Sequence, residues 1–110
     1  MRICVCDFEF RGNSFRLASM TGAELEAYVK EGTQLSEKKP ALTTPEWYLT
    51  YICKHISASL NRAGTGVEGY QETTPEKIWG ELDRPSIDAI HQKFLEWCGI
   101  SKTQGEAPAA

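Results

Sequence analysis

The residues best suited to metal or thiol chemistry are four cysteines, scattered along the chain at positions 4, 6, 53 and 98. A structural zinc site is recognised by paired cysteines at C-x-x-C spacing, and this sequence has no such pair. We therefore expect the cysteines to be small buried apolar residues rather than metal ligands. The alternatives are a metal site that adds His55 or His91, and incidental thiol chemistry.

Acid–base or nucleophilic catalysis needs a base beside a nucleophile, and the sequence offers no such set. His55 and His91 each fall beside the apolar stripe of a predicted helix, where a partly buried histidine with a hydrogen-bonding neighbour is the common case. The serines have no G-x-S-x-G setting, and the glycines at 64, 66 and 69 match neither phosphate-binding motif. The sequence therefore predicts a binding protein, not an enzyme, with no cofactor and no metal.

Composition limits the number of domains and the kinds of partner. The chain has 110 residues and a formal net charge of −3. It has no basic patch, so we do not expect nucleic acid as the main partner, because phosphate contacts dominate that affinity. No apolar run approaches the ~20 residues of a membrane span, and no signal-peptide pattern is present, so we expect a cytosolic protein. We expect one domain over residues 1–100 and a disordered tail over 101–110.

The elements that position these side chains begin with a β-hairpin. The stretch Phe8-Glu-Phe-Arg-Gly-Asn-Ser-Phe-Arg-Leu17 alternates apolar and polar residues on both sides of Gly12-Asn13. A two-residue turn at these positions pairs Phe10 with Phe15. One face is polar and stays in water. The other is expected to pack on the helices, and it consists of Cys4, Cys6, Phe8, Phe10, Phe15 and Leu17.

Capping motifs and apolar spacing then predict about four helices. Thr21 and Glu24 form a capping box for a helix to about Lys30, followed by a loop over 31–42 that is either a connector or a segment that orders on a partner. The motif Thr-Thr-Pro-Glu at 43–46 and 73–76 starts helices over 45–62 and 75–82, separated by a flexible glycine-containing loop. A last helix over 87–98 ends at Gly99. The predicted fold class is α+β, mostly helical, with the N-terminal hairpin packed on about four helices.

Aromatic residues crowd the start of the longest predicted helix. At 3.6 residues per turn, Trp47 and Leu49 point about 200° apart, so the apolar side chains here cannot all face one neighbour. Either this helix lies centrally in the fold, or it offers aromatic side chains to a partner, since Trp and Tyr also anchor interfaces. The candidate partner-binding residues are Trp47, Tyr48, Tyr51 and Trp79.

Several of these patterns together resemble a known family. Five features of the sequence are similar to the tail assembly chaperones of long-tailed bacteriophages. They are the opening pattern F-x-F-R-G-x-x-F-R-L with a short capped helix, a central helix ending Ala58-Ser-Leu-Asn-Arg-Ala63, a glycine-bearing loop, a Thr-Pro-Glu helix start and a last amphipathic helix closing with Trp97-Cys-Gly-Ile100. The resemblance covers roughly residues 6–100. It implies a mostly helical domain of the host cytoplasm that binds the tape measure protein, keeps it soluble and helps deliver tail tube protein to it.

Two other classes of function remain as alternatives. One is a different small phage structural or head–tail joining protein. The other is a small helical regulatory domain that binds DNA, which would need a basic recognition helix. The last predicted helix offers only Lys93, against Asp88 and Glu96. We therefore expect a protein partner.

Overall fold

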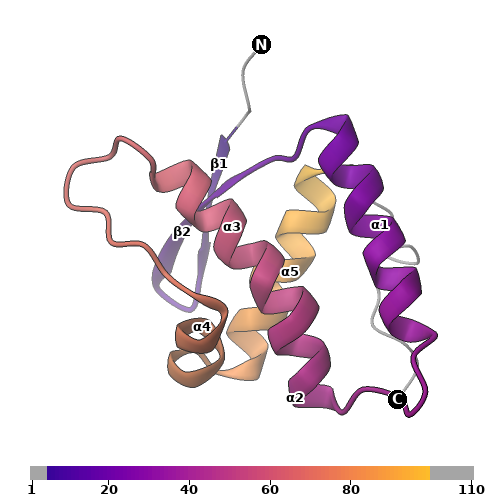
Figure 1. Cartoon of the computed structure of the whole chain (residues 1–110). Coiled ribbons are helices and arrows are strands. Elements are labelled where there is room, and N and C mark those ends of the chain that lie inside the picture. Colours follow the sequence, from indigo (N-terminus) through magenta and orange to yellow (C-terminus); the bar gives the residue numbers. More distant parts are fainter. Residues whose placement is uncertain (1–4, 100–110) are drawn as a thin grey trace.

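The computed structural model describes residues 5–99, which form an N-terminal β-hairpin followed by helices (Figure 1). This arrangement confirms the predicted α+β class, mostly helical, with four helices when the continuous segment over 44–64 is counted as one. The expectations for Cys4 and for the tail over 101–110 lie outside the described residues. The elements are β1 (Val5–Phe10), β2 (Asn13–Ala18), α1 (Gly22–Ser36), α2 (Thr44–Trp47), the π-helical turn η1 (Tyr48–Ile52), α3 (Cys53–Gly64), α4 (Pro75–Glu81) and α5 (Arg84–Trp97).

The hairpin turn lies one residue earlier than the sequence predicts. Arg11 and Gly12 have φ angles of 51° and 82°, the pair of positive values that a type I′ turn requires. The predicted Gly12-Asn13 turn and the pairing of Phe10 with Phe15 are therefore wrong. The observed cross-strand pairs include Cys6–Leu17, Phe8–Phe15 and Phe10–Asn13.

This change of register leaves the two faces of the hairpin as predicted. Each pairing moves by two residues, and side chains alternate between faces with a period of two. Leu17 is fully buried, and the rings of Phe8 and Phe15 lie 5.4 Å apart. Phe10 is the exception, because it lies next to the turn, outside the buried cluster, with the Arg11 guanidinium 5.2 Å from its ring centre. The expectation that Phe10 packs in the core is wrong.

Helix α1 starts as predicted but extends further. The Thr21 Oγ1 accepts from the Glu24 N–H and the Glu24 carboxylate accepts from the Thr21 N–H, which completes the capping box. The helix then continues to Ser36, so the first half of the predicted 31–42 loop is helical. Gly32 does not end the helix. A Cβ at this position would lie 2.6 Å from the Tyr51 hydroxyl oxygen, so glycine permits close contact between α1 and η1.

The next helix also starts where the sequence predicts. The Thr43 hydroxyl accepts from the Glu46 N–H and forms a second capping box, and Thr74 caps α4 through the Lys77 N–H. Between α2 and α3, however, one turn is π-helical: the Cys53 N–H donates to the Tyr48 carbonyl, five residues earlier. A prediction based on a uniform period of 3.6 residues cannot anticipate this extra residue in the turn.

A short break separates the last two helices, α4 and α5. Asp83 caps α5 by accepting from the Ser86 N–H at 2.9 Å, so α5 begins at Arg84 rather than near Ile87. Gly99 follows the helix with a φ of 76°, as predicted for its C-terminal cap. Figure 1 shows α3 in front of α5, with α1 along one side and the hairpin along the other.

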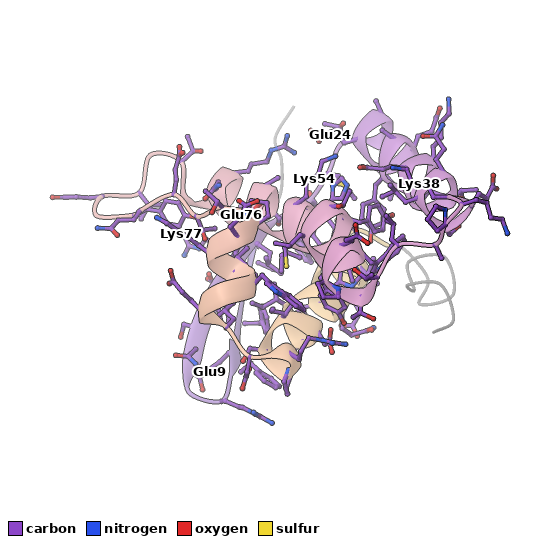
Figure 2. All side chains as sticks on the ribbon, turned by 60° about the horizontal axis from the view of Figure 1, so that its bottom comes forward. Glu9, Glu24, Lys38, Lys54, Glu76 and Lys77 are labelled. Carbon is purple, nitrogen blue, oxygen red and sulfur yellow. The ribbon has the colours of Figure 1, made fainter. Side chains whose placement is uncertain are left out.

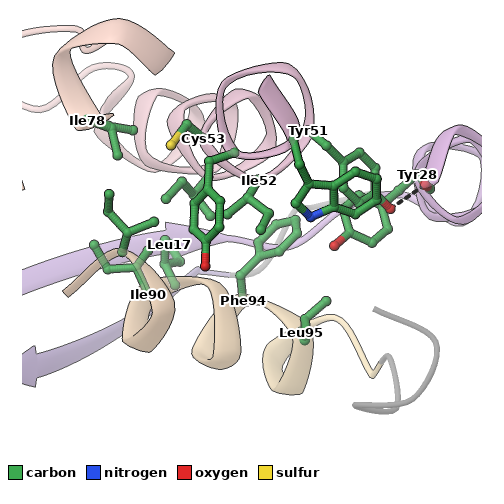
Figure 3. Close-up of a cluster of buried hydrophobic side chains, with 13 residues drawn as sticks. Leu17, Tyr28, Tyr51, Ile52, Cys53, Ile78, Ile90, Phe94 and Leu95 are labelled. Carbon is green, nitrogen blue, oxygen red and sulfur yellow. Dashed lines mark hydrogen bonds between the residues drawn. The ribbon is translucent and has the colours of Figure 1, made fainter. Parts of the chain in front are cut away.

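One buried apolar cluster joins these elements (Figure 3). The hairpin and every helix of the described chain contribute to it. Its members are Leu17, Tyr28, Trp47, Tyr48, Tyr51, Ile52, Cys53, Ile56, Ile78, Ile87, Ile90, Phe94 and Leu95.

Candidate functional site

The four residues predicted to bind a partner lie in or against this core. Trp47, Tyr48 and Tyr51 are only 5%, 7% and 2% exposed, and Trp79 is half-buried with its ring 5.3 Å from that of Tyr48. A partner cannot reach a buried ring, so Trp47, Tyr48 and Tyr51 do not form an open docking surface in this conformation. The structure favours the other interpretation in the sequence, in which the aromatic helix lies centrally.

Hydrogen bonds hold two of these rings in place. The Tyr51 hydroxyl donates to the Tyr28 carbonyl at 2.6 Å, and the Tyr48 hydroxyl donates to the Asp88 carboxylate at 2.6 Å. Burial raises the pKa of both phenols. The Trp47 indole N–H differs, since it is buried and has no acceptor among residues 5–99.

The two histidines are largely buried and hydrogen-bonded, as the sequence predicts. The His91 Nε2 lies 2.9 Å from the Tyr28 hydroxyl, and burial lowers the pKa of His91 to about 4. The His55 Nε2 lies 2.9 Å from the Glu31 carboxylate, and burial lowers the pKa of His55 as well. These contacts connect α1 to α3 and α5.

The described cysteines are free thiols in apolar surroundings. Cys53 is fully buried, and burial raises its pKa to about 11. Cys6 and Cys98 are half-buried, and burial raises their pKa values too. Within residues 5–99, no group of three or more His, Cys, Asp and Glu side chains could hold a metal ion.

A cleft of about 500 Å³ lies between β2, the end of α3, the loop that follows it, and α4. Figure 1 shows this loop projecting from the body of the protein before it returns to α4. The floor and rim of the cleft are mostly apolar. Its main apolar side chains are Phe15, Leu60, Val67, Tyr70, Ile78 and Leu82.

One side chain, Asn61, holds the loop that forms a wall of this cleft. Its Oδ1 accepts from the Tyr70 hydroxyl at 2.7 Å and from the Thr73 N–H at 2.9 Å. Its Nδ2 donates to the Thr73 carbonyl at 2.9 Å. The sequence predicts a flexible linker here, but these three bonds attach the end of the loop to α3.

Gly64 provides the second attachment. A Cβ on Gly64 would lie within 2.5 Å of three ring carbons of Tyr70, so only glycine lets that ring sit against the end of α3. Tyr70 remains 37% exposed and Val67, in the same loop, 47% exposed. These two side chains place exposed apolar surface at the rim of the cleft.

The charged side chains of the cleft come from β2 and α4. The Arg16 guanidinium is paired with Asp7 on the neighbouring strand, with 2.7 Å between Nε and Oδ1. Lys77 and Glu81 come from α4, and Figure 2 shows Lys77 on the side of α4 next to the loop. The cleft is thus an apolar surface with charged edges.

We expect Asn61→Ala to release the loop from α3. The change removes three hydrogen bonds, each with a typical net contribution of about 1 kcal/mol, and leaves the Thr73 backbone groups without this partner. Backbone ¹⁵N relaxation should show increased motion over residues 65–73, with unchanged values in α1. Unchanged relaxation in the loop would show that Asn61 does not hold it.

The sequence contains weak signals for this site. Tyr70 lies one residue after Gly69 in a polar stretch, and Asn61 lies near the end of a predicted helix. Neither is unusual in itself. The contact between them depends on the path of the loop, which local sequence rules do not determine.

Comparison with protein-family models, curated proteins and solved structures finds no significant match to this chain. None of the helices within residues 5–99 is long and apolar enough to cross a membrane.

Proposed function

We propose that this protein functions by binding another protein rather than as an enzyme, and that it is a bacteriophage tail assembly chaperone. In this role it binds the tape measure protein in the host cytoplasm and keeps that long apolar chain soluble during tail assembly. The sequence resemblance over residues 6–100 supports the phage assignment.

The observation that supports protein binding is the cleft beside the 65–73 loop. Tyr70 and Val67 expose apolar surface on its rim, and the floor is lined by Phe15, Leu60 and Ile78. Tyrosine is among the residues that most often dominate binding energy, and clustered exposed apolar side chains commonly mark interaction sites. An amphipathic partner helix would place apolar residues at i, i+3, i+4 and i+7 in such a groove.

The test is co-expression with a segment of the tape measure protein. The unmutated protein should increase the soluble fraction of that segment. Val67→Asp should weaken binding of the purified segment at least tenfold, because it places a charge on the apolar rim. Tyr70→Ala should weaken binding by about 2 kcal/mol or more, roughly thirtyfold, as expected when a tyrosine that dominates an interface is truncated. Titration calorimetry measures both effects.

Trp97→Ala is the matched control. Trp97 is as exposed as Tyr70, at 37%, but it lies at the end of α5 and does not line the cleft. This variant should bind as the unmutated protein does. If the unmutated protein neither binds nor solubilises the segment, the chaperone proposal fails. If it binds and both cleft variants retain full affinity, the cleft is not the site.

A further inference from the structure

The two outer edges of the hairpin differ in their hydrogen bonding at Ala18 of β2. In an antiparallel pair, alternate residues direct their N–H and C=O groups toward the partner strand, and the residues between them direct theirs outward. In the observed register, Phe10 lies opposite Asn13 beside a two-residue turn. The backbone N–H and C=O groups that point away from the partner strand therefore belong to residues 5, 7 and 9 of β1 and to residues 14, 16 and 18 of β2.

A side chain from α3 covers the end of the β2 edge. The Ala18 N–H donates to the Ser59 hydroxyl oxygen at 2.9 Å, and that hydroxyl donates to the Ala18 carbonyl at 2.7 Å. Ser59 is buried, at 6% exposed. Both outward backbone groups of Ala18 are therefore satisfied within the fold, and another strand cannot use them.

The β1 edge has no such partner within residues 5–99. The outward backbone groups of Val5, Asp7 and Glu9 form no hydrogen bond with the described part of the chain, and all three residues are exposed. Val5 is 47% exposed, although it is apolar. An exposed strand edge of this kind is a template for pairing with another strand.

The acidic side chains of β1 disfavour pairing with a second copy of the same strand. A second copy that paired β1 with β1 in antiparallel fashion would bring Asp7 opposite Asp7 or Glu9, and like charges directly opposite each other are destabilising. The Asp7 carboxylate is already paired with Arg16, at 2.7 Å from Nε. Glu9 has no ion pair among the described residues and lies near the end of the hairpin (Figure 2).

We propose that the β1 edge binds an extended segment of a different protein by strand addition, with a lysine or arginine of that segment facing Glu9. Backbone bonds from the Asp7 and Glu9 positions provide the attachment, and the basic residue sets the preference. This surface is separate from the cleft, and the proposal does not rest on the proposed function.

The probe is a capped seven-residue peptide in which lysine alternates with valine, compared with a twin that carries glutamate in place of lysine. The lysine peptide should shift the amide resonances of Asp7 and Glu9 and slow their hydrogen exchange at least tenfold. It should bind at least tenfold more tightly than the glutamate peptide. The absence of any shift at millimolar peptide, or shifts confined to residues of the cleft, overturns the proposal.

Proline variants separate the two edges. Glu9→Pro removes an outward N–H from β1 without removing a bond between the strands, and should abolish peptide binding. Ser14→Pro makes the matched change on β2 and should leave binding intact. Equal loss in both variants contradicts the assignment to β1.

Glu9→Lys is a second variant at this position, because it keeps the backbone N–H and does not require the strand to accept a proline. It should reverse the preference so that the glutamate peptide binds more tightly. An unchanged preference for lysine overturns the role of Glu9. Sedimentation that shows a dimer of the unmutated protein, lost in Glu9→Pro but not in Ser14→Pro, would instead identify a second copy as the occupant.

Discussion

Leu17→Ala should lower the free energy of unfolding by about 2–5 kcal/mol, the usual range when a fully buried leucine is truncated. Leu17 is 0% exposed and connects the inner face of β2 to the helices. Its loss leaves a cavity where the hairpin meets the core, and a two-stranded hairpin has little stability of its own. Urea unfolding followed by circular dichroism measures the change.

Phe10→Ala is the matched comparison on the same face of the hairpin. Phe10 lies outside the buried cluster and packs beside the Arg11 guanidinium, so its truncation should cost about 1 kcal/mol or less. Truncation of the larger side chain, Phe10, therefore has the smaller effect on the free energy of unfolding. If Phe10→Ala costs as much as Leu17→Ala, the observed hairpin register is contradicted.

Acidification between pH 6.5 and 4.5 should destabilise the fold through His91. Its pKa is lowered from 6.5 to about 4 by burial, so the unfolded chain binds a proton that the folded chain does not. The contribution of neutral His91 to the stability of the fold is present above pH 6.5 and is lost as the pH falls toward 4. The loss at pH 5 should be about 2 kcal/mol from this residue.

The surroundings of His91 determine how the effect is isolated. It contacts the Tyr28 hydroxyl, with Asp88 on its own helix and His55 on α3 as its charged or titratable neighbours. The pKa of His55 is also lowered, so His55 destabilises in the same direction. The pKa of Glu24 is lowered to about 2 by its hydrogen bonds to Arg62 and Thr21, so protonation of Glu24 reduces the stability of the fold only below pH 4.5.

His91→Gln keeps a neutral hydrogen-bonding side chain near Tyr28 but cannot titrate. Its unfolding free energy should change about 2 kcal/mol less than that of the unmutated protein between pH 7 and pH 5. His55→Gln is the control, and it should retain the His91 component. Identical pH profiles for the unmutated protein and His91→Gln would rule out His91 as the source.

The hairpin shows which part of a fold can be predicted from alternating residues. The face that Leu17 and Phe15 share follows from the period of two, so the sequence predicts it correctly even with the wrong turn. The turn itself could not be chosen locally, because both Arg11-Gly12 and Gly12-Asn13 contain a residue suited to positive φ. The Arg11 guanidinium lies 3.3 Å from the Asp83 carboxylate, a contact between residues far apart in sequence that local patterns do not contain.

The helix starts can be predicted because capping is a local interaction, as at Thr21 and Thr43. The end of α1 cannot be predicted in this way, because a glycine such as Gly32 normally favours a helix end, whereas here it allows contact with Tyr51. Local sequence patterns do not predict the cleft, for a related reason. Its wall depends on Asn61 reaching a residue twelve positions later, after the chain has reversed direction.

The π-helical turn has a consequence for how the protein accommodates changes in length. A turn with one additional residue lets the aromatic start of the helix and the apolar stripe of α3 both face the core, although they are out of phase on a regular α-helix. Deleting or inserting a residue in this turn would rotate Trp47 relative to Ile56 and leave both flanking helices otherwise unchanged. The extra residue in this turn therefore sets the rotation of one half of the continuous helix relative to the other. It determines which side chains of the two halves face the core.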